Sequence, residues 1–466
     1  MIEKFKYLLK NIGIFTISQF SSKILIFFLL PLYTNVMSTE EYGIYDLSIS
    51  IVELLYPILT INIIDAVMRF LLDKKYKSSD VISIAFKYVS WSILVASGIT
   101  LVFWIFKPIT SFAGYELLIF LYYVTYVIHQ FSVQVAKGLE KIKSIGFAGV
   151  IGTLSLVLSN LLFLLVFEWK LNGFFLANII SQIIPAIFLL INTKVWKHII
   201  PYTDKSVSRD MAAYCVPLIV NTLVWWGNSA ISKFTVTFFI GVSANGILSI
   251  AYKIPNMLSV LQGIFNQGWQ ISAIKEYDDD SGDKSFFDTT VLMVNAAMLV
   301  GASFIIIITE WLATFLFAKD FYIAWQYVPL LVLAVVLNTN SGIYGAILSA
   351  KKKSKAMAIS SVIGIAVNLV LNIVLINLIG LQGATIASVV SSFVILILRK
   401  IIVGEKYKTK WEKHIYLCFV LVAIQSLIKI YAMVSYSVFF ELIIFGIIIC
   451  IFAFPVMNIL LRKGQK

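Results

Sequence analysis

Charged residues are scarce in this chain: they make up 13% of its 466 residues. Each of the three cysteines stands alone in an apolar segment, so neither a disulfide framework nor cysteine chemistry is expected. The three histidines are scattered without metal-ligand spacing. The glycine pattern of a P-loop is also missing, which argues against a nucleotide hydrolase. We therefore expect no cofactor and no metal.

What the chain does have is apolar sequence. Hydrophobic residues make up 60% and the mean hydropathy is +0.93, which indicates an all-α integral membrane protein. The apolar stretches run about 20–27 residues, the length of a spanning helix and not of a barrel strand. Fourteen transmembrane helices are predicted, at 11–33, 43–65, 82–106, 115–136, 145–167, 171–193, 212–240, 246–272, 287–308, 322–348, 357–378, 381–398, 414–432 and 437–461.

The positive charge is distributed unevenly along the chain. Of the 37 lysines and arginines, 29 fall in segments on one side of the predicted membrane. The alternate loops carry four, Lys107, Lys170, Lys319 and Lys429. Because cytoplasmic loops are rich in lysine and arginine, this asymmetry places both termini in the cytoplasm. The net charge of +13 is thus a topology signal, and no nucleic-acid partner is predicted.

An internal repeat underlies the order of the spans. Lys23 and Lys233 each follow a serine inside an apolar segment, 210 residues apart. With the same offset, the pattern Leu-x-Gly-x-x-x-Ala-x-x-x-Ser occurs at 171–181 and 381–391. Six spans per repeat insert the same way up, so the two halves should be related by a pseudo-twofold axis along the membrane normal. We predict two pseudo-symmetric six-helix lobes (1–200 and 201–402) around a central cationic cavity, with two extra C-terminal helices in 403–466.

Lysines inside the spans are candidates for a binding site. Lys23 stands about 12 residues into its span, or ~18 Å from the start, too deep to reach the interface easily. Lys23 and Lys233 either bond the carbonyls of a neighbouring helix or line a water-filled cavity, and the repeat favours the cavity. Lys253 precedes Pro255, which should kink its span, and it either faces the same cavity or extends to the interface. An ammonium is a compact charge suited to phosphate.

Acidic residues near these lysines are gate or cavity candidates. Glu53 lies in the middle of the second predicted span, where it could pair with Lys23 or titrate during transport. Asp65 and Arg69 are four residues apart at the end of the same span, the spacing of a pair on one helix face. They form either a structural salt bridge or a functional pair, which is part of an inner gate or contacts a lipid headgroup.

A polar stripe marks the eighth predicted span. Gln262, Asn266, Gln267 and Gln270 recur on one side of a helix that is otherwise apolar. The stripe lines a water-filled cavity or joins two helices by hydrogen bonds, and we favour the cavity.

Several motifs resemble those of the polysaccharide-repeat (O-antigen type) flippases in the multidrug/oligosaccharidyl-lipid/polysaccharide exporter superfamily. They are spread over nearly the whole chain, at Glu41–Tyr45, Asp65–Arg69, Phe239–Ile247, Ala251–Pro255 and Phe265–Ala273. Members of that family often carry an acidic–basic pair before the Phe-x-Gly motif. Here Ser232-Lys233 stands at that place, so the base is kept and the acid is lost.

The resemblance implies a function. It implies that an undecaprenyl-diphosphate-linked oligosaccharide moves from the inner to the outer leaflet of the bacterial cytoplasmic membrane by alternating access, for O-antigen or capsule synthesis. It also implies that Lys23, Lys233 and Lys253 contact the diphosphate. The expected partners are this lipid-linked substrate, membrane lipids and other membrane proteins of polysaccharide assembly.

Two other functions stay open at this point. A drug or cation antiporter of the same superfamily would have twelve spans and membrane-embedded acids, whereas the embedded bases outnumber the acids here. A membrane glycosyltransferase or polymerase would need a sizeable extracytoplasmic loop, and none is predicted.

Overall fold

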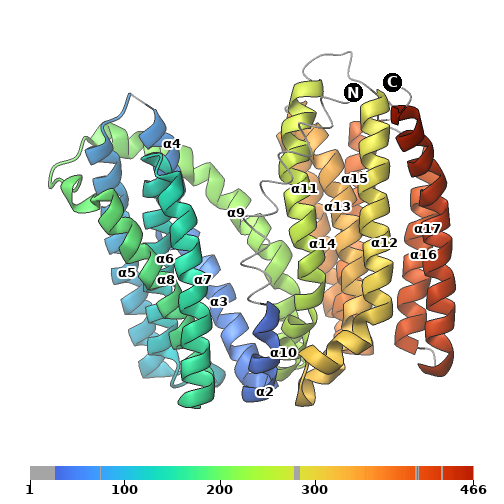
Figure 1. The fold of residues 1–466 in the computed structure, drawn as a ribbon. Coiled ribbons are helices and arrows are strands. Elements are labelled where there is room, and N and C mark those ends of the chain that lie inside the picture. The colour runs from blue at the N-terminus through green and yellow to red at the C-terminus, as the bar shows by residue number, and fades with distance from the viewer. Residues whose placement is uncertain are drawn as a thin grey trace. The chain divides into compact units, whose positions relative to one another are not determined.

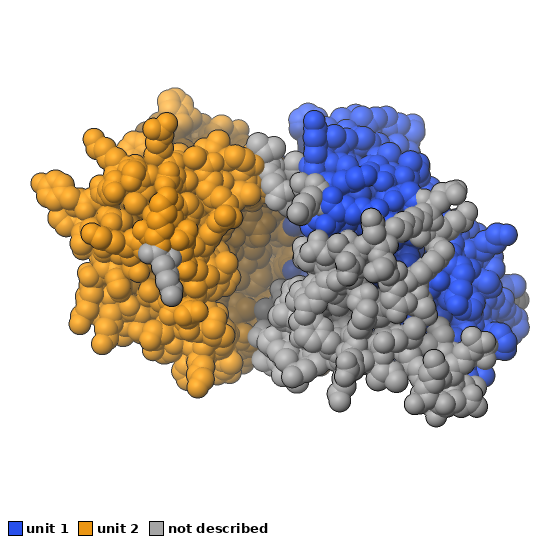
Figure 2. Space-filling model, turned by 90° about the horizontal axis from the view of Figure 1, so that it is seen from above, with its two compact units in different colours: residues 1–23, 231–466 blue, residues 24–230 orange. Residues whose placement is uncertain are grey.

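The computed structural model describes residues 27–73, 75–277, 284–351, 353–404, 407, 409–431 and 434–464. These residues form helices and their connections, and no strand occurs among them (Figure 1). The described residues of 24–230 form one compact unit, called unit 2, and those of 231–466 form another, called unit 1 (Figure 2). The division falls within α9, so the predicted lobe boundaries at 200 and 402 stay a prediction.

Unit 2 is a bundle of helices joined by short connections. Its elements are α2 (Leu30–Val36), α3 (Thr39–Leu59), α4 (Ile63–Leu72), α5 (Ser78–Phe106), η1 (Thr110–Phe112), α6 (Glu116–Gly138), α7 (Ile142–Asn160) with the π-helical η2 (Leu161–Val166), α8 (Lys170–Thr193), η3 (Val195–Lys197) and most of α9 (Lys205–Phe239). The start of α3 is fixed by a capping box, in which Ser38 and Glu41 each accept a hydrogen bond from the other's backbone N–H.

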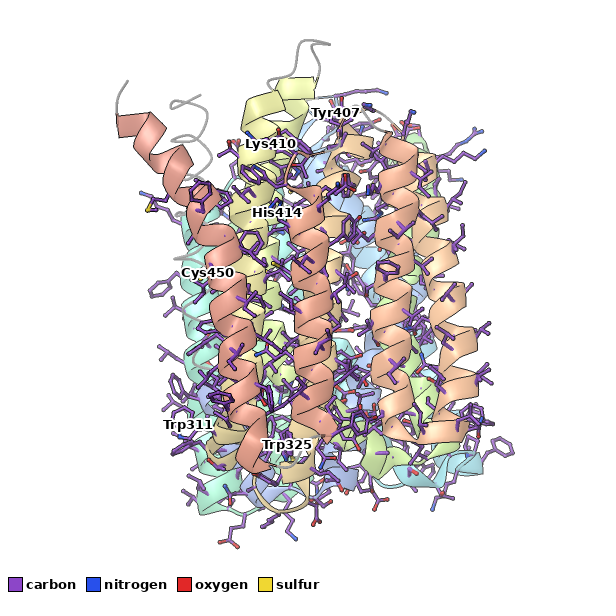
Figure 3. All side chains as sticks on the ribbon, turned by 90° about the vertical axis from the view of Figure 1, so that its right-hand side faces the viewer. Trp311, Trp325, Tyr407, Lys410, His414 and Cys450 are labelled. Atoms are coloured by element: carbon purple, nitrogen blue, oxygen red, sulfur yellow. The ribbon has the colours of Figure 1, made fainter. Side chains whose placement is uncertain are left out.

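Unit 1 holds the end of α9 and the remaining helices. They are α10 (Val242–Ala251), α11 (Lys253–Tyr277), α12 (Lys284–Leu316), η4 (Lys319–Tyr327), α13 (Val328–Ala350), α14 (Ser354–Ile379), α15 (Leu381–Val403), α16 (Glu412–Tyr431) and α17 (Val434–Gly464). Trp311 and Trp325 lie near one end of this bundle, and Tyr407, Lys410 and His414 lie near the other (Figure 3). Tryptophan is typical of membrane–water interfaces.

The chain is a multi-pass membrane protein, as its composition predicts. Eleven helices within the described part of the chain are long and apolar enough to span a membrane, and Ala230–Phe239 and Val242–Ala251 are shorter apolar helices. The all-helical membrane class is therefore confirmed. The count of fourteen, the arrangement of the lobes and the side on which the termini lie stay predictions, and most of the first predicted span falls outside the described residues.

Two predicted spans are each divided in the structure. The span predicted at 43–65 ends with α3 at Leu59, because Ile61 and Asn62 take left-handed backbone conformations before α4 begins. The span predicted at 246–272 divides at Tyr252, between α10 and α11. Pro255 then lies in the first turn of α11, where the missing N–H of proline removes no helical hydrogen bond. The expected break near Pro255 therefore occurs three residues before it.

The same helix packing recurs in the two units. Helices α6, α7 and α8 begin at residues 116, 142 and 170, and α13, α14 and α15 begin at 328, 354 and 381, an offset of 211–212 residues. In unit 2, α8 packs against α6 and α7, and in unit 1, α15 packs against α13 and α14.

Glycines at matching positions let these helices approach each other. A methyl group on Gly152 of α7 would come within 3.1 Å of the carbonyl oxygen of Ser181 on α8. On Gly364 of α14 it would overlap Ile395 and come within 3.7 Å of the carbonyl oxygen of Ser391 on α15. The repeated Leu-Gly-Ala-Ser pattern therefore forms close helix–helix contacts in both units.

Candidate functional site

Two of the three candidate lysines can be placed in the structure. Lys233 lies in the apolar stretch Ala230–Phe239 at the end of α9, and Lys253 is the first residue of α11. Both side chains are partly buried, and both belong to unit 1. Lys23 lies outside the described residues. The structure thus places two cationic side chains on different helices of one unit, and their role in a binding site stays a prediction.

The neighbour of Lys233 is held in a buried polar network. The Ser232 hydroxyl donates to Asn368 Oδ1 at 3.3 Å and accepts from Asn372 Nδ2 at 3.2 Å. Asn368 in turn donates to the Ser391 hydroxyl of α15 at 3.2 Å. These four side chains are at most 6% exposed and join α9, α14 and α15. The network therefore fixes the backbone from which Lys233 extends.

Part of the polar stripe predicted on α11 contacts a neighbouring helix, and its role as a cavity lining stays a prediction. Asn266 packs against α13, since a methyl group on Gly342 would lie 3.0 Å from its amide atoms. Trp269 is fully buried and donates to the Ile343 carbonyl at 3.2 Å. Gln262 is partly buried, and the side chain of Gln267 lies outside the described part of the chain. This face of α11 therefore contacts α13 at Asn266, one of the four stripe residues, and at Trp269.

Glu53 has an exposed side chain on α3, within unit 2. Its charge acts on Tyr122 and Tyr126, two buried or largely buried residues of the neighbouring α6. An exposed carboxylate in the middle of an apolar helix remains compatible with the predicted cavity or gate role.

Asp65 and Arg69 do not pair with each other. Asp65 Oδ1 accepts hydrogen bonds from the Tyr56 hydroxyl of α3 at 3.3 Å and from Gln134 Nε2 of α6 at 3.2 Å. The Arg69 guanidinium instead lies 4.5 Å from the centre of the Tyr214 ring on α9. The salt bridge that their spacing suggested is therefore wrong, because each side chain finds a closer partner on another helix. Asp65 joins α3, α4 and α6.

Two buried cations escaped the sequence analysis, which assigned both to loops. Arg399 is 8% exposed on α15, and its guanidinium donates to the Ser341 carbonyl and hydroxyl and to the hydroxyls of Ser360 and Ser361. Lys429 is 4% exposed on α16 and lies 3.6 Å from both Glu310 of α12 and Glu441 of α17. Counting charge by segment cannot detect such partners, because they come from distant parts of the chain. Both clusters join helices within unit 1.

Comparisons with known proteins agree with this architecture. A family model described as "Polysaccharide biosynthesis protein" matches residues 8–269. No curated protein matches the chain by sequence.

Among solved structures, the lipid II flippase MurJ in an inward closed conformation has a TM-score of 0.63 at 15% identity, over 97% of this chain and 100% of that chain. An inward-facing multidrug resistance MATE family transporter of the MOP superfamily has a TM-score of 0.65 at 12% identity, over 85% of this chain and 95% of that chain. A MOP superfamily transporter from Pyrococcus furiosus has a TM-score of 0.59 at 12% identity, over 89% of this chain and 96% of that chain. The chain shares the fold of these proteins along nearly its whole length.

Proposed function

This chain belongs to the polysaccharide biosynthesis protein family, and on that premise we propose that it moves a lipid-linked oligosaccharide across the cytoplasmic membrane. The family match covers more than half of the chain, and the shared fold is that of transporters and not of enzymes. The proposed cargo is an undecaprenyl-diphosphate-linked repeat unit for a surface polysaccharide such as O-antigen or capsule. The glycosyltransferase alternative is set aside on these grounds.

The observation that carries this proposal is the position of Lys233 and Lys253. Lys233 lies in the short apolar helix Ala230–Phe239, where a charge at membrane depth costs about 2.5–3.5 kcal/mol on insertion scales and therefore calls for a function, and Lys253 begins the following long helix, α11. The proposed cargo combines a hydrocarbon chain, an anionic diphosphate and a polar sugar. A cationic site at membrane depth offsets the cost of bringing the diphosphate into the bilayer, while the hydrocarbon chain stays in the lipid.

The buried network beside Lys233 supports its role as a positioned group. Ser232 is held by Asn368 and Asn372, so the backbone of α9 cannot rotate Lys233 away without breaking buried hydrogen bonds. In transporters of this kind, one lobe rocks against the other about the bound group. An inside-negative potential favours outward movement of an anion by about 2.3 kcal/mol per charge per 100 mV.

The test is a leaflet-resolved flipping assay in vesicles that contain the purified protein and an undecaprenyl-diphosphate-linked oligosaccharide. The substitutions Lys233→Ala, Lys253→Ala and Lys23→Ala should each slow flipping, and Lys233→Arg should retain more activity than Lys233→Ala. Lys355→Ala, at an exposed lysine near the start of α14, is the matched control. Wild-type flipping by the Lys23→Ala/Lys233→Ala double variant would overturn the proposal.

The same vesicles distinguish the flippase from a cation antiporter. The antiporter is the second candidate because the fold is similar to that of a multidrug transporter. An antiporter would export a lipophilic cation against an imposed proton or sodium gradient, and removal of lysines would not weaken that export. Cation export without oligosaccharide flipping would replace the present proposal.

A further inference from the structure

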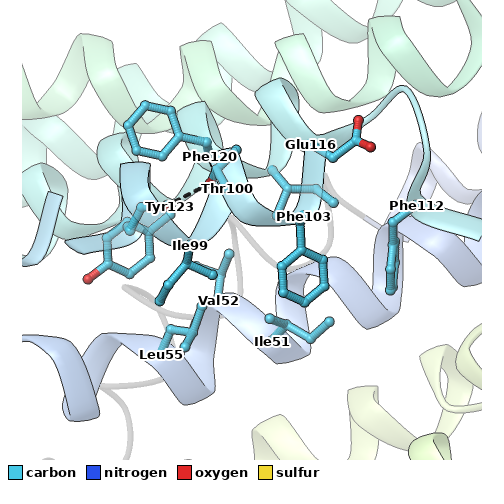
Figure 4. Close-up of a pocket in the computed structure, with 12 residues that line it drawn as sticks. Ile51, Val52, Leu55, Ile99, Thr100, Phe103, Phe112, Glu116, Phe120 and Tyr123 are labelled. Atoms are coloured by element: carbon cyan, nitrogen blue, oxygen red, sulfur yellow. Dashed lines mark hydrogen bonds between the residues drawn. The ribbon is translucent and has the colours of Figure 1, made fainter. Parts of the chain in front are cut away.

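Unit 2 contains a partly open cavity of ≈ 90 Å³ between α3, α5 and α6 (Figure 4). Ligand sites commonly measure about 300–1,000 Å³, so this space holds a segment of a narrow molecule and not a whole ligand. All three helices are candidate membrane spans. The cavity is lined by residues of unit 2 alone, and none of the three candidate lysines is among them.

The lining of this cavity is almost entirely apolar. Isoleucine, valine and leucine side chains come from α3, and Ile99 and Phe103 of α5 face them (Figure 4). The Thr100 hydroxyl is already satisfied, because it donates to the Ala96 carbonyl at 2.9 Å. An apolar cavity does not hold ordered water well, so its natural occupant in a bilayer is hydrocarbon.

The cavity runs inward from one end of the bundle. Glu116 lines it at the first residue of α6, and Tyr123 lines it seven residues further along the same helix. At 1.5 Å per residue the two positions are about 10 Å apart along the helix axis. The hydrocarbon core of a bilayer is about 30 Å thick, so this length reaches from the interface into one leaflet. That is the direction and depth of a lipid acyl chain.

A single carboxylate lies at the interfacial end of the cavity. Glu116 is 8% exposed, and its Oε2 accepts a hydrogen bond from the backbone N–H of Gly114 at 2.7 Å. No described residue donates to its Oε1. The carboxylate repels a phosphate or diphosphate and attracts an ammonium, with which it can form a charge-assisted hydrogen bond.

From this arrangement we propose that the cavity binds one chain of a phospholipid whose head group carries a primary ammonium, with that ammonium paired to Glu116. The chain lies between Ile99 and the residues of α3, and Glu116 selects the head group. Glu116 disfavours the substrate's own diphosphate at this place, so the bound lipid is a membrane phospholipid and not the cargo. The proposal goes beyond transport and does not depend on the identity of the cargo.

The chain site is tested by filling the cavity. Purified protein is taken from vesicles of phosphatidylethanolamine and phosphatidylglycerol, and the retained lipid is counted by native mass spectrometry. Ile99→Trp should reduce the retained phosphatidylethanolamine about tenfold, which corresponds to 1.4 kcal/mol of binding free energy. Leu94→Trp, on the same helix at a side chain that is 63% exposed, is the matched control and should retain lipid like the wild type. Equal retention by the wild type and Ile99→Trp would overturn the proposal.

The head-group site is tested by Glu116→Gln, which keeps the side-chain shape. Its preference for phosphatidylethanolamine over phosphatidylglycerol should fall about tenfold, the usual scale of a lost charge-assisted bond. Glu40→Gln, at an exposed residue at the start of α3, should keep the preference. A preference unchanged in Glu116→Gln would overturn the head-group assignment. Displacement of the bound lipid by undecaprenyl phosphate at equal concentration would assign the cavity to the cargo chain instead.

Discussion

The two units join their helices in different ways. In unit 2 an aromatic cluster links α2, α3 and α8: the ring of Phe174 lies 4.5 Å from that of Tyr33 and 4.2 Å from that of Tyr45. Phe175 adds an edge contact to Tyr45 at 5.2 Å. In unit 1 several helices are joined by polar contacts instead, through Arg399, Lys429 and the Ser232 network.

This difference shows that the two halves of the repeat share their close backbone contacts but differ in the side chains between the helices. The close helix contacts at Gly152 and Gly364 occupy matching places in both units, because they decide how near two backbones come. The side chains that fill the remaining space between the helices are not restricted in this way, so they can differ between the units. Aromatic packing gains free energy by burial alone, whereas buried polar groups stabilise only when each finds its partner. Unit 1 should therefore be the more sensitive to single polar substitutions.

The largest effect is expected at Lys429. Lys429→Ala leaves Glu441, which is fully buried, without its ammonium, so the free energy of unfolding should fall by about 3–5 kcal/mol. The double variant Lys429→Met/Glu441→Leu removes both charges and should recover most of this loss. Denaturant unfolding of the purified protein measures the difference. A single variant as stable as the double would show that unit 1 does not depend on this pair.

A comparable loss of stability is expected in unit 2 when a large buried side chain is shortened, and not when a polar group is removed. Phe175 is fully buried, so Phe175→Ala should cost about 3–5 kcal/mol of unfolding free energy. Tyr45→Phe removes only a hydroxyl that bonds no described residue, and it should cost less than about 1 kcal/mol. Thermal unfolding of both variants in the same detergent gives the comparison. A larger loss for Tyr45→Phe than for Phe175→Ala would reject the contrast between the units.

A smaller effect compares two matching glycines. On Gly383 of α15 a methyl group would overlap the backbone of Leu375, which cannot move easily. On Gly173 of α8 it would lie 2.9 Å from the side-chain Cβ of Phe163. Overpacking costs about 1–3 kcal/mol, and Gly383→Ala should lie at the upper end and Gly173→Ala at the lower. Unfolding temperatures in the reverse order would mean that the two helix pairs have diverged in packing.

The features that could be predicted from the sequence are those that depend on residues close together in the chain. Long apolar stretches predicted the membrane helices, and the pattern at 381–391 predicted a repeated element because glycine, alanine and serine recur at fixed spacing on one helix face. The left-handed turn at Ile61 and Asn62 was missed, since neither residue is a glycine or a proline and the nearby Pro57 lies inside α3.

The candidate site was less predictable because it depends on partners from distant helices. Asp65 and Arg69 have ideal spacing for an ion pair, yet Tyr56, Gln134 and Tyr214 compete successfully for them. Lys429 was counted among the loop charges, since nothing near it in sequence shows that Glu310 approaches it. The lysine roles stay predictions, and the flipping assay tests them.

The smallest effect is expected where unit 2 leaves the membrane. Asp204 lies in the connection before α9, and its carboxylate accepts the backbone N–H of Ser206 at 2.8 Å. This bond holds the pKa of Asp204 below its ordinary value of 3.8. A depressed folded-state pKa contributes stability that is present above the unfolded value and is lost as the pH falls through the folded pKa. Asp204→Asn should therefore lower the unfolding temperature slightly at neutral pH, and the gap to the wild type should close in acid. A gap that stays constant down to the acid limit would mean that the carboxylate charge of Asp204 adds nothing to its capping bond.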